Sequence, residues 1–370
     1  MQSKRILFFD GLRGSAALLV ALFHFSASSR LLDSPFVSNA WLCVDLFFVL
    51  SGFVLDRRYF LEQRSSFREF AIARTGRMLP VYFVMLLIFV IIDGFFYLKN
   101  GGKTSDLVFA VVINGTLLQS FGFLDKLWFY GPSWSISAEL WINLFLFLVL
   151  RRVRSVWFLI VLTILSCIIF VFYLNIQTSH DFGWLRCLYG LLVGILCSRI
   201  ALALGLSDRC KVSNSWFLGD IIAVLLLYTA FAIPSFAPYS PIIFGIIILY
   251  GVLCCDMLIV RIFSSRVMVF LGKISFAVYM THFLIGGRMM RFVVPKLSRK
   301  LELHIVTFGD GKKWDGLMLG VGELQGIAFI VLYVVLVCCI ATLVHYLFEA
   351  PVYRVWKKNR CWACKLAEIK

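Results

Sequence analysis

Long apolar runs recur from one end of this chain to the other, and they constrain the fold more than any other feature. A helix needs about 20 apolar residues to cross a hydrocarbon core of roughly 30 Å, because each residue adds only about 1.5 Å. Of 370 residues, 61% are hydrophobic and 15% are charged, whereas about a quarter are charged in an ordinary soluble domain. Because backbone polar groups in lipid must be satisfied internally, we expect an all-α, polytopic bundle within a membrane.

The borders of the apolar runs predict about ten transmembrane helices. These cover residues 8–29, 40–56, 78–98, 134–150, 156–174, 183–199, 216–233, 241–259, 272–294 and 323–347. A further apolar stretch, 107–123, contains Asn114, Thr116 and Gln119, and counting it as a span would spoil the alternation of the later loops. We expect a re-entrant or interfacial helix there. The whole chain, 1–370, is expected to form one transmembrane domain.

The basic residues are distributed unequally between alternate loops. Placing the N-terminus in the cytosol puts 23 of the 36 Lys and Arg residues on the cytosolic side and 11 on the outer side, as the positive-inside rule requires. The cytosol then receives a basic loop at 57–77 and a basic tail at 348–370, so both termini are expected there. The net charge of +16 follows from these loops, and we expect no nucleic-acid partner.

Ionisable side chains inside the predicted spans are the candidates for chemistry, because an Arg or Asp at a helix centre costs about 2.5–3.5 kcal/mol on insertion scales. Arg13 and His24 lie in the first span, Asp45 in the second and Glu139 in the fourth. The separation of Arg13 and His24 corresponds to about 1100°, close to three full turns, which predicts one shared face and about 16 Å between them along the axis. We expect the two side chains to line one cavity at two depths.

Three of these groups fall at one depth in the outer half of the membrane. His24 lies near the outer end of the first span, while Asp45 and Glu139 each lie a few residues into an inward-running span. One imidazole and two carboxylates at one level form the arrangement that a general base with an orienting partner needs. The alternative is that they are paired polar residues that stabilise helix contacts.

Other residues have simpler structural explanations. His282 fits a core or helix-packing position as well as a functional one, and Ser51 and Gly52 fit close helix packing better than catalysis. Cys361 and Cys364 form a CxxC pair in the basic tail, but a structural zinc site needs four ligands and the neighbouring sequence supplies no others. We therefore expect reduced thiols and no metal.

Six sequence blocks, in order, resemble the acyltransferase-3 family of membrane O-acyltransferases: FFDGLRGSAALLVALFHF, VDLFFVLSGFVL, FREFAIARTGRMLP, GPSWSISAELW, ISFAVYMTHFLI and FEAPVYR. They cover the chain nearly end to end. Arg13 and His24 match the family's pattern of Arg, ten residues and His, and Arg74 and Arg77 match its RxxR pair on the cytosolic loop. The fourth block has one acidic residue where many members have two, which leaves Glu139 as its carboxylate candidate.

The resemblance implies transfer of an acyl group, commonly acetyl from acetyl-CoA, to a hydroxyl of a cell-envelope or exported glycan or a lipid-linked sugar. The candidate catalytic residues are then His24, Arg13, Asp45 and Glu139. Arg74 and Arg77 are candidates for binding CoA, because guanidinium groups bind phosphate through charge-assisted, bidentate hydrogen bonds. Acyl-CoA is expected as a co-substrate, with no tightly bound cofactor. The expected location is the plasma membrane (the bacterial inner membrane), with membrane lipids as further partners.

Two other classes of function remain open. In a transporter or flippase for a polar solute or lipid-linked sugar, the same ionisable residues would form a substrate or proton pathway. No internal repeat is visible, and many secondary transporters have one. A membrane scaffold without activity would tolerate His24→Ala. Dependence on acyl-CoA distinguishes an acyltransferase from both.

Overall fold

The computed structural model describes residues 7–61, 65–153, 155–173, 178–205, 216–254, 257–308 and 317–356. Helices dominate these residues, and the strands among them are β1 (Val306–Phe308) and β2 (Leu317–Leu319), which pair antiparallel. The predicted all-α class is therefore confirmed. Cys361, Cys364 and the rest of the predicted basic tail beyond residue 356 lie outside the described residues.

Fifteen α-helices lie among the described residues. They are α1 (Leu7–Phe23), α2 (Arg30–Asp33), α3 (Pro35–Ser38), α4 (Cys43–Leu55), α5 (Phe67–Lys99), α6 (Thr104–Gly115), α7 (Trp134–Arg152), α8 (Val156–Tyr173), α9 (Gly183–Ala203), α10 (Trp216–Ala232), α11 (Ser240–Leu253), α12 (Leu258–Phe263), α13 (Arg266–Leu284), α14 (Arg291–Lys300) and α15 (Glu323–Val344). Short π-helical segments extend three of them, at Asp56–Phe60, Ile285–Met290 and His345–Glu349.

Six helical stretches of the described residues are long and apolar enough to cross a membrane. They are Phe67–Lys99, Gly131–Arg152, Gly183–Ala203, Pro234–Leu253, Arg266–Lys300 and Glu323–Trp356. The predicted count of about ten is not confirmed. The remaining predicted spans form α1, α4, α8 and α10, which hold 13 to 18 residues each, fewer than the about 20 of a typical crossing.

The segment expected to be re-entrant or interfacial forms α6, which packs against α5. Its 12 residues are too few for a full crossing, since 12 residues rise only about 18 Å. An irregular stretch then leads to α7. The short length agrees with the expectation that this segment is not a span.

Helix α5 begins earlier than the sequence predicts. Ser66 and Glu69 form a capping box at its N-terminus, in which each side chain accepts a hydrogen bond from the other residue's backbone N–H. This motif satisfies helix donors that otherwise have no partner. Arg74 and Arg77 therefore lie on the helix. The prediction that they lie in a 57–77 loop is wrong.

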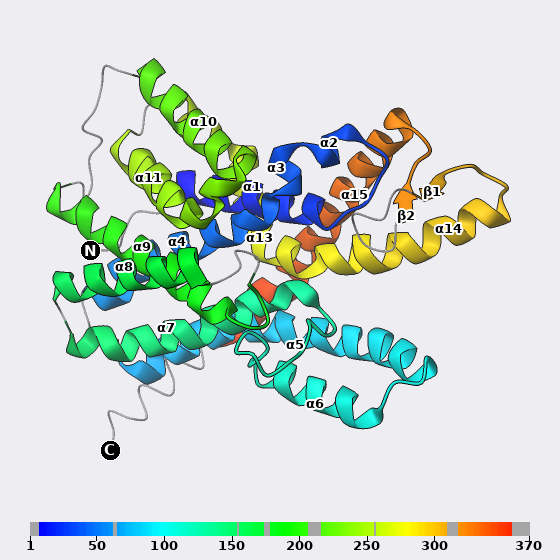
Figure 1. Ribbon diagram of the computed structural model, residues 1–370, viewed down its shortest axis with the longest axis horizontal. Helices are drawn as coiled ribbons and strands as arrows, with labels where there is room; N and C mark the ends of the chain where they lie inside the picture. The colour runs from blue at the N-terminus through cyan, green and yellow to red at the C-terminus, as the bar shows by residue number, and fades with distance from the viewer. Residues whose placement is uncertain are drawn as a thin grey trace.

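Two helix pairs form the centre of the molecule, α1 with α13 and α4 with α9 (Figure 1). Glycines bring the backbones together: a Cβ on Gly14 would lie 2.5 Å from the backbone nitrogen of Gly272, and one on Gly52 would lie 2.1 Å from the carbonyl oxygen of Leu191. Small residues at helix contacts are typical of membrane bundles. The packing explanation for Gly52 is confirmed.

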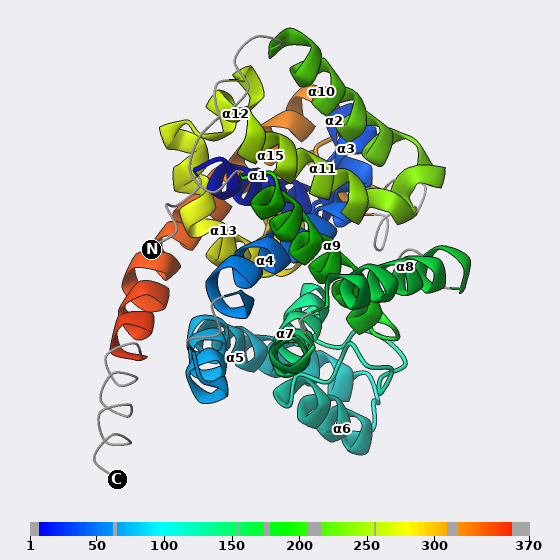
Figure 2. The same ribbon diagram turned by 90° about the vertical axis from the view of Figure 1, so that its left-hand side faces the viewer.

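Helices α4 and α9 run parallel, because Asp45 pairs with Arg186 at one end and Asp56 pairs with Arg199 at the other. In Figure 2, α5, α6 and α7 lie on one side of this pair and α10 and α11 on the other. The predicted orientation of the spans agrees with this. If α5, α7 and α8 each cross the membrane and α6 does not, three crossings separate α4 from α9, and the two helices run in the same direction.

Candidate active site

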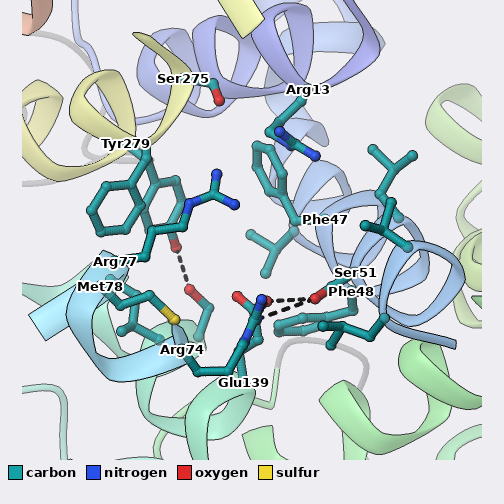
Figure 3. Close-up of a pocket in the computed structure, with 17 residues that line it drawn as sticks. Arg13, Phe47, Phe48, Ser51, Arg74, Arg77, Met78, Glu139, Ser275 and Tyr279 are labelled. Carbon is teal, nitrogen blue, oxygen red and sulfur yellow. Dashed lines mark hydrogen bonds and ion pairs between the residues drawn. The ribbon is translucent and has the colours of Figure 1, made fainter. Parts of the chain in front are cut away.

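A cavity of about 130 Å³ lies among α1, α4, α5, α7 and α13 (Figure 3). Each of these helices contributes polar side chains to its wall. They are Arg13, Ser51, Arg74, Arg77, Ser135, Glu139, Ser275 and Tyr279. Three arginines against one glutamate give the wall a formal charge of +2. The cavity is therefore suited to an anionic ligand.

Glu139 is held by hydrogen bonds from two neighbouring helices. Arg74 donates through Nη2 to Glu139 Oε1 at 2.5 Å, and Ser51 donates through Oγ to the same oxygen at 2.6 Å. Only 13% of the Arg74 side chain and 21% of the Glu139 side chain are exposed, so the attraction is less screened than at a surface. Glu139 thus fixes one guanidinium in the cavity wall.

Arg74 retains a donor beyond this pair. Its Nε is buried and has no hydrogen-bond acceptor among the described residues. A buried guanidinium N–H without a partner costs free energy, so an oxygen of a ligand or a water molecule at this position would be stabilising. Arg74 stays a candidate for binding CoA, and its Nη2 is shared between Glu139 and Ser51.

Arg13 and Arg77 approach the cavity from different helices. Figure 3 shows their guanidinium groups turned toward the same space. Arg13 Nη1 lies 3.7 Å from Asp10 Oδ1, and a quarter of its side chain is exposed. Arg77 is exposed at the cavity rim. The structure thus gathers three of the predicted arginines, Arg13, Arg74 and Arg77, around one cavity.

His24 follows the last residue of α1 and lies against α13. Its Nδ1 is 2.9 Å from the carbonyl oxygen of Val20 and 3.3 Å from Nε2 of His282. His24 is not among the residues of the cavity wall. Tyr279, which is in that wall, has its ring 5.7 Å from the ring of His282. The prediction that Arg13 and His24 line one cavity is therefore not confirmed by this cavity, which contacts the histidine pair through Tyr279.

Tyr279 is held in this position by α7 and the turn before it. Its hydroxyl donates to the carbonyl oxygen of Pro132 at 2.7 Å and lies 2.8 Å from Ser135 Oγ. The hydroxyl of Tyr130 donates to the carbonyl oxygen of Tyr279. Phe129, just before Tyr130, has a φ of 57°, a strained value for an aromatic residue. This strained turn directs Tyr130 into the core beside the histidines.

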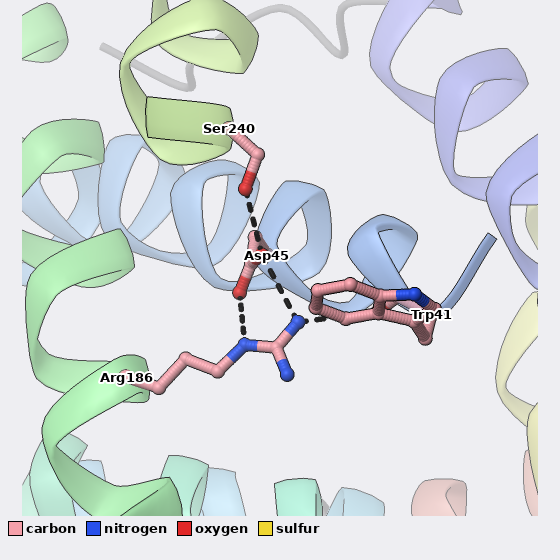
Figure 4. Close-up of polar contacts among 4 residues, drawn as sticks. All are labelled: Trp41, Asp45, Arg186 and Ser240. Carbon is pink, nitrogen blue, oxygen red and sulfur yellow. Dashed lines mark hydrogen bonds and ion pairs between the residues drawn. The ribbon is translucent and has the colours of Figure 1, made fainter. Parts of the chain in front are cut away.

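Asp45 lies in a buried ion pair (Figure 4). Arg186 donates through Nε and Nη2 to its two carboxylate oxygens at 2.7 and 3.0 Å, and Ser240 donates to the second oxygen at 2.8 Å. The guanidinium of Arg186 also lies over the ring of Trp41, 4.9 Å from its centre. The carboxylate oxygens are thus occupied by α9 and α11.

The predicted meeting of His24, Asp45 and Glu139 at one site does not occur. Glu139 pairs with Arg74, Asp45 pairs with Arg186, and His24 lies beside His282. For Asp45 the structure favours the alternative of a paired polar group that stabilises the bundle.

Sequence reasoning missed the roles of four residues in this region. They are Ser51, Arg186, Tyr279 and His282. Arg186 carried a usable signal, because a charge within a span implies a partner. Ser51 was attributed to packing, yet its hydroxyl binds Glu139. Tyr279 and His282 carried little signal beyond their place in one of the six blocks.

The fold and the site define a polytopic membrane protein with a cationic cavity beside a pair of histidines, of which His282 is fully buried. The model of the acyltransferase-3 family, described as an acyltransferase domain, matches residues 6–346. The chain belongs to this family, as its sequence blocks predict, and is an integral membrane protein.

Known relatives are distant. A putative O-acetyltransferase of Staphylococcus aureus is 24% identical over 314 residues, which are 74% of this chain and 49% of that protein. The peptidoglycan O-acetyltransferase OatA of Listeria monocytogenes is 28% identical over 127 residues, 32% of this chain and 17% of OatA. This chain thus spans half or less of the length of these relatives. No solved structure matches it significantly.

Proposed function

We propose that this protein is an O-acyltransferase that moves an acetyl group from acetyl-CoA to a hydroxyl of a cell-envelope glycan. The observation that carries the proposal is the cavity with three guanidinium groups, next to the histidine pair. Family membership supports the reaction class, and the names of the Listeria and Staphylococcus relatives support acetyl transfer. The glycan acceptor is proposed from the name of OatA.

CoA carries several phosphate charges, and the wall of the cavity has the complementary charge. Arg77, which is exposed, is the residue that meets an incoming phosphate, and Arg13 extends the basic wall from α1. Arginine suits this contact because its planar fork donates two parallel hydrogen bonds to phosphate oxygens. The long, flexible pantetheine arm then extends past the ring of Tyr279 toward His24.

The reaction replaces a thioester with an oxygen ester. The acceptor hydroxyl attacks the thioester carbonyl, a C–O bond forms, and the C–S bond breaks. His24 takes the proton from the hydroxyl, and that proton is then passed to the departing CoA thiolate, which leaves as the thiol. A positioned imidazole suits both steps, because the same ring nitrogen can accept a proton and then donate it.

The orientation is a part of the proposal that can be tested by itself. Residue 65 lies on the side that receives 23 of the 36 basic residues, which the positive-inside rule places in the cytosol. We therefore expect Ser65→Cys to react with a membrane-impermeant thiol reagent only after permeabilisation. His304→Cys is expected to react in intact cells. Labelling is measured relative to the wild type, which contains eleven Cys. Reaction of Ser65→Cys in intact cells would reverse the orientation and the entry side for CoA.

Arg77→Ala is expected to weaken acetyl-CoA binding by about tenfold or more, because a hydrogen bond to a charged group contributes about 1.5–3 kcal/mol. Binding is measured by calorimetry on the purified, folded protein. Arg74 is the poorer choice, because its removal also leaves Glu139 without its partner.

Arg68→Ala is the matched control for Arg77→Ala. Arg68 is exposed on the same helix, nine residues away, and therefore about 180° around the axis from Arg77. Its replacement is expected to leave the affinity unchanged. Equal affinities of wild type, Arg68→Ala and Arg77→Ala would remove Arg77 from the CoA site.

A further inference from the structure

His282 lies fully buried on α13, beside the end of α1. Its Nδ1 is 2.7 Å from the carbonyl oxygen of Tyr279 and 3.2 Å from that of Val278, both in the preceding turn. Its Nε2 points to Nδ1 of His24 at 3.3 Å. Both ring nitrogens of His282 therefore have defined neighbours.

These neighbours decide which nitrogen of each ring carries the proton. A carbonyl oxygen can only accept, so the ring nitrogen facing it must donate. Nδ1 of His282 faces the carbonyl of Tyr279, and Nδ1 of His24 faces that of Val20 at 2.9 Å. In two neutral rings, both protons are then on Nδ1, and Nε2 of His282 is left as an acceptor.

The acceptor Nε2 of His282 lies 3.3 Å from the donor Nδ1 of His24. The proton on Nδ1 of His24 is shared between the carbonyl of Val20 and Nε2 of His282. The lone pair of His24 is consequently on Nε2, and this is the atom that can take a proton from a substrate hydroxyl. The partner of the inactive nitrogen sets the tautomer of a catalytic histidine.

The two rings are also fixed relative to each other. The hydroxyl of Tyr333, on α15, contacts the carbonyl oxygens of Ala21 at 3.0 Å and of His282 at 3.2 Å, so it bridges the backbones of α1 and α13. The ring of Phe283 lies edge-on to that of His24, with 5.7 Å between centroids. Packing of this kind limits the rotation of the imidazole.

We propose that His282 is a positioning residue for His24: it shares the Nδ1 proton of His24 with the carbonyl of Val20, and so holds the ring in the orientation that presents Nε2 as the base. This inference rests on the proposed function, in which His24 removes the proton from the acceptor hydroxyl. It also explains how a base works here without a carboxylate, since Asp45 and Glu139 are both paired elsewhere.

His282→Phe and His282→Gln test this role. Phenylalanine fills the space without an acceptor, whereas the side-chain oxygen of glutamine lies near the position of Nε2 and can accept the same proton. We expect His282→Phe to lower kcat by about 10- to 100-fold, as misplacement of a catalytic group does, with KM for acetyl-CoA unchanged. His282→Gln should recover most of the rate. Thr281→Val, a buried change in the same turn, is the control for packing and should keep the wild-type rate.

A double variant separates positioning from simple structural support. In a His24→Ala background, His282→Phe is expected to cause no further loss, because residues that act as one unit are not additive. Solid-state NMR of ¹⁵N-labelled histidine should show the His24 proton on Nδ1 in both proteins, because the carbonyl of Val20 is kept. The Nδ1 chemical shift of His24 should change in His282→Phe, because the contact with His282 is lost.

Different results would overturn the positioning role of His282 and the proposed function of the protein. A further loss from His282→Phe in the His24→Ala background, or an unchanged Nδ1 chemical shift of His24 in the single variant, would overturn the positioning role. The same holds if His282→Phe keeps full activity while His24→Ala is impaired. Full activity of His24→Ala itself would instead overturn the proposed function.

Discussion

His24→Ala is expected to lower acyl transfer by about 10²- to 10⁴-fold, the usual contribution of a positioned general base. The protein should still insert and fold, because His24 lies beyond the last residue of α1 and its removal leaves the backbone hydrogen bonds of that helix intact. Initial rates of transfer from radiolabelled acetyl-CoA are compared at equal amounts of folded protein. His304→Ala, a change at an exposed histidine, is the control and should keep the wild-type rate.

A relocated histidine makes this test more specific. In a His24→Ala background, Phe23→His moves the imidazole by one residue, which turns it about 100° around the helix axis. The relocated ring then loses its contact with His282, and activity should not return. Wild-type activity of this variant would show that the direction of the imidazole does not matter and that His24 is not the base.

Asp45→Ala is expected to destabilise the fold by about 3–5 kcal/mol, because it leaves a buried charge without its partner. Only 1% of the Asp45 side chain and 3% of the Arg186 side chain are exposed. The free energy of unfolding is measured in detergent with a chemical denaturant. Lys99→Ala, a change at an exposed position at the end of α5, should have little effect and is the control.

A compensating variant identifies the cause of the loss. Asp45→Leu with Arg186→Leu and Ser240→Ala removes the pair and the hydroxyl together, and an apolar replacement of a buried pair is often neutral. This triple variant should regain most of the stability and retain activity. Asp45→Asn with wild-type stability but abolished transfer would contradict this explanation and return Asp45 to the catalytic residues.

The sequence predicted where helices lie better than how many of them cross the membrane. Hydrophobic runs and charged borders located each predicted span at a helix, because the cost of charge in lipid acts on local sequence. The ends were less accurate: α5 begins at Phe67 because a capping box, not hydropathy, sets its first turn. Helices α1 and α4 are short, which a hydropathy pattern does not resolve.

The sequence predicted many of the residues of the candidate site, but it did not predict which side chains pair with one another. Arg13, Arg74, Arg77 and Glu139 do meet at one cavity. The partner of Asp45 is 141 positions away on α9, and no period in the sequence links the two. Positions along the predicted spans put Asp45 and Glu139 at the same depth as His24. The same depth does not mean that the side chains face one another, because it leaves the rotation of each helix undetermined. That is decided by tertiary packing, here by the glycine contacts of α1 with α13 and α4 with α9.

Mass spectrometry of cell-envelope and exported glycans tests most directly our proposal that this protein acetylates a glycan hydroxyl. Glycans are compared from cells with the wild-type protein, without it, and with His24→Ala at equal expression. We expect acetyl esters on a glycan hydroxyl, a mass increase of about 42 Da each, with the wild type and their loss in the other two. Glycans with the same acetylation in all three samples would contradict the claim.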